Sequence, residues 1–163
     1  MEIERKYLVR SLPNDLESYP HVEIEQGYLC TSPTLRVRRM GDDYILTVKE
    51  KMRDGATTAI VNREEEFALS DEGYHLLRAK CEGHLVCKTR YRIDLRRSEA
   101  DGLYTTQIAE LDIFHGVHEG LRLVEVEFPS PEAAEAFVAP EWFGEEVSAD
   151  PRYRNSYLAS LRN

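Results

Sequence analysis

Several segments of this chain alternate charged and apolar residues, and the charges within each segment tend to one sign. The first segment covers residues 2–6. An extended strand there would place Glu2, Glu4 and Lys6 on one face, because successive side chains of a strand point to opposite faces. The same spacing recurs in further runs at residues 35–38, 46–49, 88–93, 110–113 and 125–128. Like charges along one strand face repel and solubility does not require them, so the pattern indicates a face that holds a metal ion and a polyanion.

The composition limits the possible classes of protein. A chain of 163 residues can bury a core, and we expect a single domain over residues 1–163. No apolar run is long enough to span a bilayer and no signal peptide precedes the first charged run, so we expect a cytoplasmic protein without a membrane partner. The three cysteines do not have the spacing of metal ligands, and we expect them to be reduced thiols. A net charge of −9 disfavours nucleic acid as a partner. We also expect the protein to be a monomer or a homodimer.

The strand and helix signals predict an α+β protein dominated by an antiparallel sheet. Eight strands are expected at about residues 2–9, 23–30, 34–40, 43–51, 60–69, 85–95, 105–115 and 121–129. Three helices are expected at about residues 71–80, 130–138 and 154–161. Ser70 precedes the first helix as its N-cap residue. The second helix begins with an N-cap, a proline and an acidic residue: Ser130, Pro131 and Glu132.

Two arrangements of the sheet fit this pattern. In the first, the sheet is open, its charged face meets water and helices cover the apolar face, which is common among antiparallel sheets. In the second, the eight strands form a closed antiparallel β-barrel with an ionic interior and helices packed outside. Repelling neighbours such as Arg36 and Arg38, or Glu125 and Glu127, favour the barrel, since a ligand of opposite charge would lie between them.

The charged runs also resemble a known family. Glu2-x-Glu4-x-Lys6 is similar to the signature of the CYTH superfamily, the triphosphate tunnel metalloenzymes. Further runs resemble its small bacterial branch of inorganic triphosphatases along the whole chain, at residues 26–29, 35–38, 47–49, 88–91, 110–112, 123–128, 142–147, 150 and 152–155. The resemblance implies an eight-stranded tunnel that binds triphosphates with a divalent metal. The branch often has lysine in place of Arg154, and the two residues bind phosphate differently.

The charged residues match the chemistry of a metal–triphosphate site. Arginine and lysine neutralise phosphate oxygens, and the candidate clamp consists of Lys6, Arg36, Arg38, Lys49, Lys88, Arg90, Arg92 and, by resemblance, Arg154. Mg²⁺ or Mn²⁺ takes oxygen ligands, and the candidates are Glu2, Glu4, Asp112, Glu125 and Glu127. For Glu64, Glu66 and Glu110, the sequence is equally compatible with a functional role and with a solvated or ion-pairing role.

Tyr28 is the candidate for activating the attacking water. It shares strand parity with Gln26, and a cation such as Lys88 beside its hydroxyl would stabilise the phenolate. The resemblance implies a catalytic Tyr28–Lys88 pair, and packing in the barrel wall is the alternative role of Tyr28. Trp142 is expected to form a hydrophobic lid on the helical layer, which disfavours a thiamine-binding aromatic at a tunnel mouth.

These features together predict an enzyme, a metal-dependent phosphoanhydride hydrolase. The expected reaction converts inorganic triphosphate to pyrophosphate and phosphate, and the substrates could include nucleoside triphosphates. Two alternative enzymes share the same grip on triphosphate: a class IV adenylyl cyclase and a thiamine triphosphatase. A polyphosphate-binding module without catalysis is the alternative outside the enzymes, but a pure anion binder has no use for aligned carboxylates unless a metal intervenes.

Overall fold

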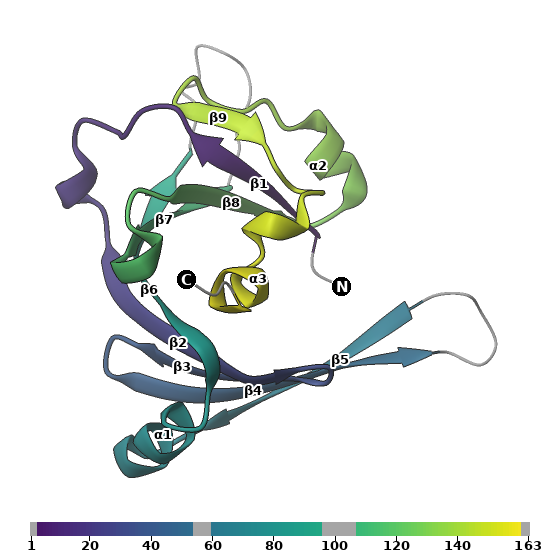
Figure 1. The fold of residues 1–163 in the computed structure, drawn as a ribbon. Coiled ribbons are helices and arrows are strands. Elements are labelled where there is room, and N and C mark those ends of the chain that lie inside the picture. The colour runs from purple at the N-terminus through teal and green to yellow at the C-terminus, as the bar shows by residue number, and fades with distance from the viewer. Residues whose placement is uncertain (1–2, 54–59, 96–106, 161–163) are drawn as a thin grey trace. The chain divides into compact units, whose positions relative to one another are not determined.

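The computed structural model describes residues 3–53, 60–95 and 107–160. These residues form one sheet with the strand order β5-β4-β3-β2-β6-β7-β8-β1-β9 (Figure 1). The strands are β1 (Ile3–Val9), β2 (His21–Thr31), β3 (Thr34–Met40), β4 (Asp43–Arg53), β5 (Ile60–Ala68), β6 (Glu82–Asp94), β7 (Ile108–His115), β8 (Arg122–Phe128) and β9 (Phe143–Glu146). The helices are α1 (Asp71–Arg78), α2 (Pro131–Ala136) and α3 (Asn155–Ser160), with the 3-10 turns η1 (Leu16–Ser18), η3 (Gly116–His118) and η4 (Pro151–Tyr153). An antiparallel sheet with few helices confirms the predicted α+β class.

Two compact units make up the chain, and the first contains residues 1–22, 88–115 and 119–153. Within it, β1 pairs with β8 and β9, and β8 also pairs with β7. One face of these strands packs in an apolar core that α2 contacts, and its members include Tyr7, Leu111, Val124, Val126 and Phe143. The charged runs occupy the other face, because one step along a strand moves the side chain to the opposite face.

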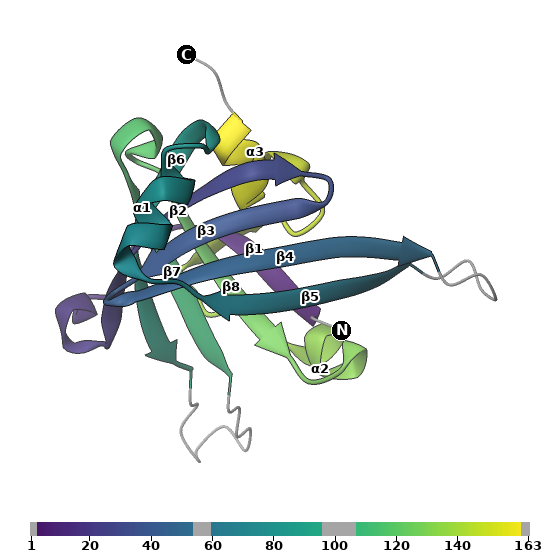
Figure 2. The same cartoon turned by 90° about the horizontal axis from the view of Figure 1, so that it is seen from below.

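The second unit contains residues 23–87, 116–118 and 154–163. Its strands β3, β4 and β5 lie side by side as antiparallel neighbours (Figure 2). Helix α1 contacts β3 and β4, and its Tyr74 hydroxyl donates a 2.8 Å hydrogen bond to the carboxylate of Glu25 in β2. Arg78 Nε donates to the same carboxylate at 2.6 Å. Since Glu25 and Gln26 are neighbours in β2, α1 covers the face opposite the one that carries Gln26.

The helix boundaries and most strand boundaries agree with the sequence predictions. Both predicted caps are present, since Ser70 Oγ accepts from Gly73 N at 3.0 Å and Ser130 Oγ accepts from Ala133 N at 3.1 Å. The predicted count of eight strands misses β9, a four-residue strand whose pairing with β1 is irregular. Closure of the sheet into a barrel and the single domain stay predictions. No helix among the described residues is long and apolar enough to cross a membrane.

Gly83, at the start of β6, gives a test of how the second unit packs. Its φ of +71° is left-handed, and a Cβ atom there would overlap the carbonyl oxygen of Ala159 in α3. Gly116 is a matched control, because its φ is +67° but no described atom lies within 4 Å of its Cβ position. We expect Gly116→Ala to cost only the left-handed strain, about 1–2 kcal/mol. Gly83→Ala should lose roughly 1–3 kcal/mol more through overpacking. Denaturant titrations measure both losses, and equal losses would contradict the close contact between Gly83 and α3.

Candidate active site

A buried charged cluster of the first unit joins β6 and β7. The Lys88 ammonium lies 2.8 Å from Asp112 Oδ2. Arg90 donates from Nε to Asp112 Oδ1 at 2.8 Å and from Nη2 to Oδ2 at 2.9 Å, a bidentate pair. Arg90 Nη1 also reaches Glu110 Oε2 at 2.7 Å. Lys88 is fully buried and Asp112 is 2% exposed, so these charges compensate one another away from water.

Burial and charge act in opposite directions in this cluster. Burial alone would raise the pKa of the Asp112 carboxyl, but Lys88 and Arg90 outweigh burial and hold this pKa at about 2. Burial lowers the pKa of the Lys88 ammonium, and Asp112 offsets part of that effect. For Arg90 the bonds to Asp112 outweigh burial and raise the pKa of the guanidinium. Asp112 is therefore ionised at neutral pH, and both of its oxygens accept hydrogen bonds from cations.

Strands β1 and β8 bring further charges to this face. Lys6 lies opposite Glu125 in the strand register, and its ammonium is 3.1 Å from Glu125 Oε1. The same ammonium donates to the carbonyl oxygen of Tyr153 at 3.1 Å. Glu110 of β7 lies opposite Glu125 on the other side of β8. The register therefore aligns Lys6, Glu125 and Glu110 in one row across three strands.

Carboxylates of β1 and β8 fit the predicted divalent metal. Glu4 lies directly opposite Glu127, and both side chains are exposed. Like charges directly opposite each other destabilise a sheet, so a cation bound between them would relieve the repulsion. Glu2 lies outside the described residues, and within those residues no three Asp, Glu, His or Cys side chains form a group that could hold a metal ion. The oxygen donors suit Mg²⁺ or Mn²⁺, which keep several waters, and the ligand set stays a prediction.

In the second unit, Arg36 and Arg38 lie on one face of β3, as the sequence predicts. Arg38 lies opposite Gln26, and its Nε donates to Gln26 Oε1 at 2.9 Å. Arg36 lies between Tyr28 and Thr47 in the register, and its Nη2 donates to Thr47 Oγ1 at 3.3 Å. Gln26 and Thr47 are buried, and neither was predicted from the sequence as a partner of the arginines. The alternation of side chains along each strand could have predicted this contact, because it places Gln26 and Thr47 on the charged face.

Glu64 and Glu66 of β5 lie on this same face of the second unit. Glu66 is opposite Thr47 and Glu64 is opposite Lys49 in the register. The Lys49 ammonium is 3.6 Å from Glu64 Oε2, and Arg36 Nη2 is 4.0 Å from Glu66 Oε1. Both glutamates are exposed, and exposed ion pairs contribute little to stability. The structure thus favours an ion-pairing role for these two glutamates, which the sequence left open.

The remaining predicted residues differ in burial. Tyr28 is 6% exposed, whereas Arg92 on β6 and Arg154, just before α3, are exposed. Tyr28 belongs to the second unit and Lys88 to the first, and their action as a pair stays a prediction. The substrate contacts of Arg92 and Arg154 stay predictions as well.

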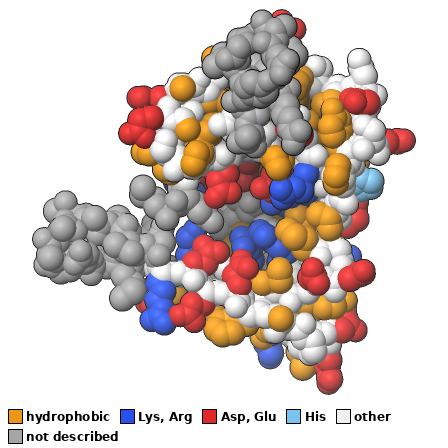
Figure 3. Space-filling model, turned by 180° about the vertical axis from the view of Figure 1, so that it is seen from behind, with side chains coloured by type: hydrophobic (Ala, Val, Ile, Leu, Met, Phe, Trp, Pro, Cys, Tyr) orange, Lys and Arg blue, Asp and Glu red, His pale blue; other side chains and the backbone are white. Residues whose placement is uncertain are grey.

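Charged residues of both signs lie next to one another on the face of the molecule shown in Figure 3. Several polar side chains on the charged strand faces are nonetheless buried: Lys6, Gln26, Thr47, Lys88 and Asp112. These parts of the charged strand faces are therefore shielded from water, whereas Glu4 and Glu127 on the same faces are exposed. The burial is also the reason that each of the buried groups needs a hydrogen-bond partner.

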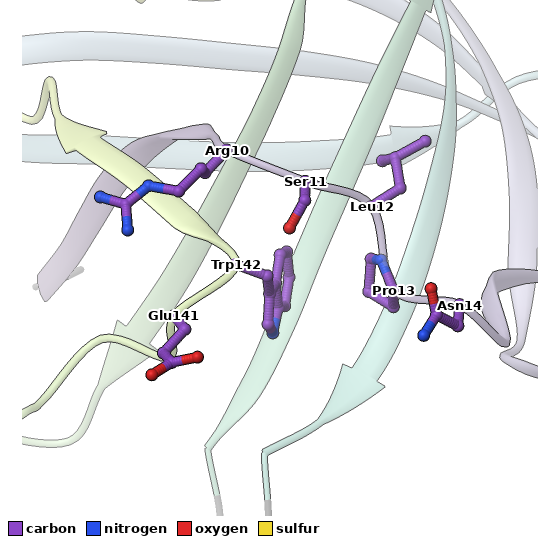
Figure 4. A pocket seen from close by; sticks show the side chains of 7 residues that line it. All are labelled: Arg10, Ser11, Leu12, Pro13, Asn14, Glu141 and Trp142. Atoms are coloured by element: carbon purple, nitrogen blue, oxygen red, sulfur yellow. The ribbon is translucent and has the colours of Figure 1, made fainter.

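Trp142 lies at a cavity of about 650 Å³ in the first unit, beside Ser11 and Pro13 (Figure 4). Its ring meets the Phe143 ring edge-on, with 4.5 Å between the centroids. Phe143 is a core residue, and Trp142 packs against the same apolar cluster. This packing agrees with the predicted hydrophobic role of Trp142.

The fold and the charged faces define a class of protein. Its members have an antiparallel sheet whose cations and carboxylates suit the binding of a polyanion together with a metal ion. The CYTH domain family matches residues 1–154, and the chain belongs to this family. It is 42% identical over 163 residues to an inorganic triphosphatase of Nitrosomonas europaea, covering 97% of this chain and 96% of the relative. An inorganic triphosphatase of Acetivibrio thermocellus is 34% identical over 164 residues, covering 96% and 92%. The crystal structure of the inorganic triphosphatase NE1496 matches with a TM-score of 0.73 and 38% identity, covering 100% of this chain and 97% of that one.

Asp112→Asn tests the buried cluster through its dependence on pH. We expect a loss of about 3–5 kcal/mol of stability at neutral pH, because the change leaves two buried cations without their carboxylate. The pKa of Asp112 is about 2 when folded and 3.8 ordinarily, so wild type loses this contribution as pH falls through that window. The difference between the two proteins should therefore shrink below about pH 4.

Denaturant titrations at neutral pH and at several acidic pH values measure this difference. Asp150→Asn is the matched control, because Asp150 also pairs with an arginine, Arg152 at 2.6 Å, but this pair is at the surface. The control should lose much less stability than Asp112→Asn at neutral pH. A difference between wild type and Asp112→Asn that stays constant down to the acid limit would contradict an ionised Asp112.

Proposed function

We propose that this chain is an inorganic triphosphatase, which hydrolyses tripolyphosphate to pyrophosphate and phosphate with a divalent metal ion. The observation that carries the proposal is the placement of like charges: Arg36 and Arg38 share one face of β3 in one unit, and the strand register opposes Glu4 to Glu127 in the other. Relatives at 42% and 34% identity, each named an inorganic triphosphatase, support the same reaction. Membership of the CYTH family supports the dependence on metal.

The proposed clamp neutralises and positions the triphosphate. Phosphoryl transfer of this kind needs little covalent chemistry from the protein, so electrostatics and orientation dominate. Arg36 and Arg38 present planar guanidinium groups that can bind two phosphate oxygens at once. Their partners include the neutral Thr47 and Gln26, and these bonds leave the positive charge that attracts phosphate uncancelled. The other proposed phosphate contacts are Lys6, Lys49, Lys88, Arg90, Arg92 and Arg154.

The carboxylates of the first unit have two proposed roles. Glu2, Glu4, Glu125 and Glu127 would hold the metal, which when bound supplies positive charge to phosphate oxygens and lowers the pKa of a coordinated water. Asp112, also a predicted ligand, has both oxygens engaged by Lys88 and Arg90. We therefore assign Asp112 the role of fixing these two cations, which leaves the metal to the glutamates.

Tyr28 is the proposed group that orients or deprotonates the attacking water. Its burial and its place opposite Arg36 support this role, because they hold the side chain on the charged face of β2. Lys88 would assist, and Asp112 holds its ammonium in place.

Adenylyl cyclase, thiamine triphosphatase and non-catalytic polyphosphate binding are the alternative functions, and a panel of substrates separates them. A cytoplasmic location, a monomeric or homodimeric state, and the lack of nucleic-acid and membrane partners stay predictions from the sequence.

Phosphate release from a panel of substrates tests the proposed reaction. We expect turnover of tripolyphosphate with Mg²⁺ or Mn²⁺, weaker turnover of ATP and thiamine triphosphate, and no turnover in excess chelator, because carboxylates alone would repel the substrate. Glu127→Gln should raise the metal concentration needed for half-maximal rate, whereas the exposed Glu132→Gln in α2 should not. Full turnover in chelator would refute the metal assignment, and cyclic AMP as the main product from ATP would favour the cyclase.

Tyr28→Phe tests the proposed activation of water. The ring is retained and only the hydroxyl is lost, so binding should change little, while kcat and kcat/KM fall together by about 10²–10⁴-fold. Tyr44→Phe is the control, because Tyr44 stacks on Tyr74 of α1 with 4.9 Å between the centroids, on the opposite face of the second unit. Steady-state kinetics with tripolyphosphate measure both variants. Wild-type kcat in Tyr28→Phe would show that Tyr28 only packs.

A further inference from the structure

Arg5 is a charged residue on the apolar face of β1. Ile3 and Tyr7 share its face, whereas Glu4 and Lys6 point to the charged face. Its guanidinium makes a bidentate pair with Glu146 of β9, with Nε at 2.9 Å from Oε1 and Nη2 at 2.6 Å from Oε2. The hydrogen bond to Glu146 raises the pKa of Arg5, and the same bond lowers the pKa of Glu146. Both groups are therefore charged at neutral pH.

The same guanidinium also binds the C-terminal end of α2. Nη1 donates to the carbonyl oxygen of Ala134 at 2.8 Å and to that of Phe137 at 3.4 Å. Carbonyl groups at a helix end lack helical partners, and a cation there is favourable. The guanidinium carbon lies 5.4 Å from the Tyr7 ring centroid and 6.0 Å from that of Phe137. Arg5 thus joins β1, β9 and α2 from the apolar face of β1.

A chain of hydrogen bonds leads from Arg5 back to Lys6. Glu146 Oε1 accepts from Ser148 Oγ at 2.9 Å, and Ser148 Oγ accepts from the backbone N–H of Lys6 at 2.9 Å. The N–H of Val147 donates to the carbonyl oxygen of Lys6 at 2.8 Å. The residues that follow Glu146 therefore hold both backbone polar groups of Lys6.

The same stretch of chain holds the Lys6 side chain. The N–H of Asp150 donates to Val147 O at 3.0 Å, and the N–H of Tyr153 donates to Asp150 O at 3.3 Å. These turns place the carbonyl oxygen of Tyr153 at 3.1 Å from the Lys6 ammonium. Residues 146–153, here called the 146–153 segment, thus fix Lys6 at its backbone and at its charged tip, and Arg5 fixes the start of this segment.

We propose that Arg5 is a positioning residue for Lys6, acting through Glu146 and the 146–153 segment from the opposite face of β1. The inference rests on the proposed function, in which Lys6 contacts the triphosphate. A lysine at position 5 would keep the charge but lose the fork that binds Glu146 through two nitrogens. The 146–153 segment would then be held less firmly, and Lys6 would sample positions that do not reach the phosphate.

Steady-state kinetics of Arg5→Lys and Ser148→Ala test this positioning role. Lys6 is a charge contact to bound and reacting triphosphate alike, so its displacement should raise KM for tripolyphosphate by about tenfold and change kcat little. Ser148→Ala keeps the Arg5–Glu146 pair but removes the acceptor of the Lys6 backbone N–H, so it should raise KM in the same direction. Arg63→Lys is the matched control, because Arg63 makes a similar fork with Glu65, at 3.0 and 2.6 Å, on an exposed face of β5. The control should keep the wild-type KM.

Hydrogen exchange gives a readout that does not depend on activity. In Arg5→Lys, the amides of Lys6 and Val147 should exchange faster than in wild type, while the amides that pair β3 with β4 keep their rates. Wild-type protein without triphosphatase activity would refute the proposed function, and the exchange result would still report on the Arg5 link. Unchanged KM and unchanged exchange at Lys6 in both variants, even with a lower melting temperature, would overturn the inference and leave Arg5 a structural anchor only.

Discussion

A β-strand has two faces, and burying the apolar face of a strand in the core also fixes the position of the charged residues on its other face. In β7, Leu111 packs in the apolar core while its neighbour Asp112 lies among cations. Burying Lys88 beside Asp112 removes both charges from water, and only close pairing with further hydrogen bonds offsets that cost. Arg90 supplies those bonds through its fork. Charge compensation within the sheet is therefore a condition of the fold as well as of the site.

The cations consequently fall into two groups, firmly held and loosely held. Lys88 and Arg90 lie 2.8 to 2.9 Å from the buried Asp112 carboxylate. Breaking either pair would leave a buried charge without its partner, which strongly destabilises a protein. Arg36 and Lys49 have exposed glutamate oxygens at 4.0 and 3.6 Å, and such pairs are weak. In the proposed function, phosphate oxygens replace these weak partners of Arg36 and Lys49. The pairs of Lys88 and Arg90 thus fix the geometry of β6 and β7 within the first unit.

Alternation in the sequence predicted which residues share a strand face, because a period of two survives in any pairing of the strands. It could not predict partners. Asp112 and Glu125 are both acidic and both face the charged side, yet Asp112 binds two cations of β6, whereas Glu125 pairs with Lys6 of β1. That difference follows from which strands are neighbours, a property of the fold and not of the local sequence. The short β9 was not predicted, because four residues are too few to display an alternation.

A residue that departs from the alternation carries information that the alternation lacks. In the sequence, Arg5 simply looks like one more charge in the first run, although its position belongs to the apolar face of β1. A guanidinium on that face loses hydration, so it is tolerated only where its donors find partners. Its main partner, Glu146, is 141 residues away, and only the folded chain brings the two together. The first charged run thus has a part on each face: Glu4 and Lys6 lie on the charged face, to which the proposed function assigns the ligand, and Arg5 on the apolar face links β1 to β9 and α2.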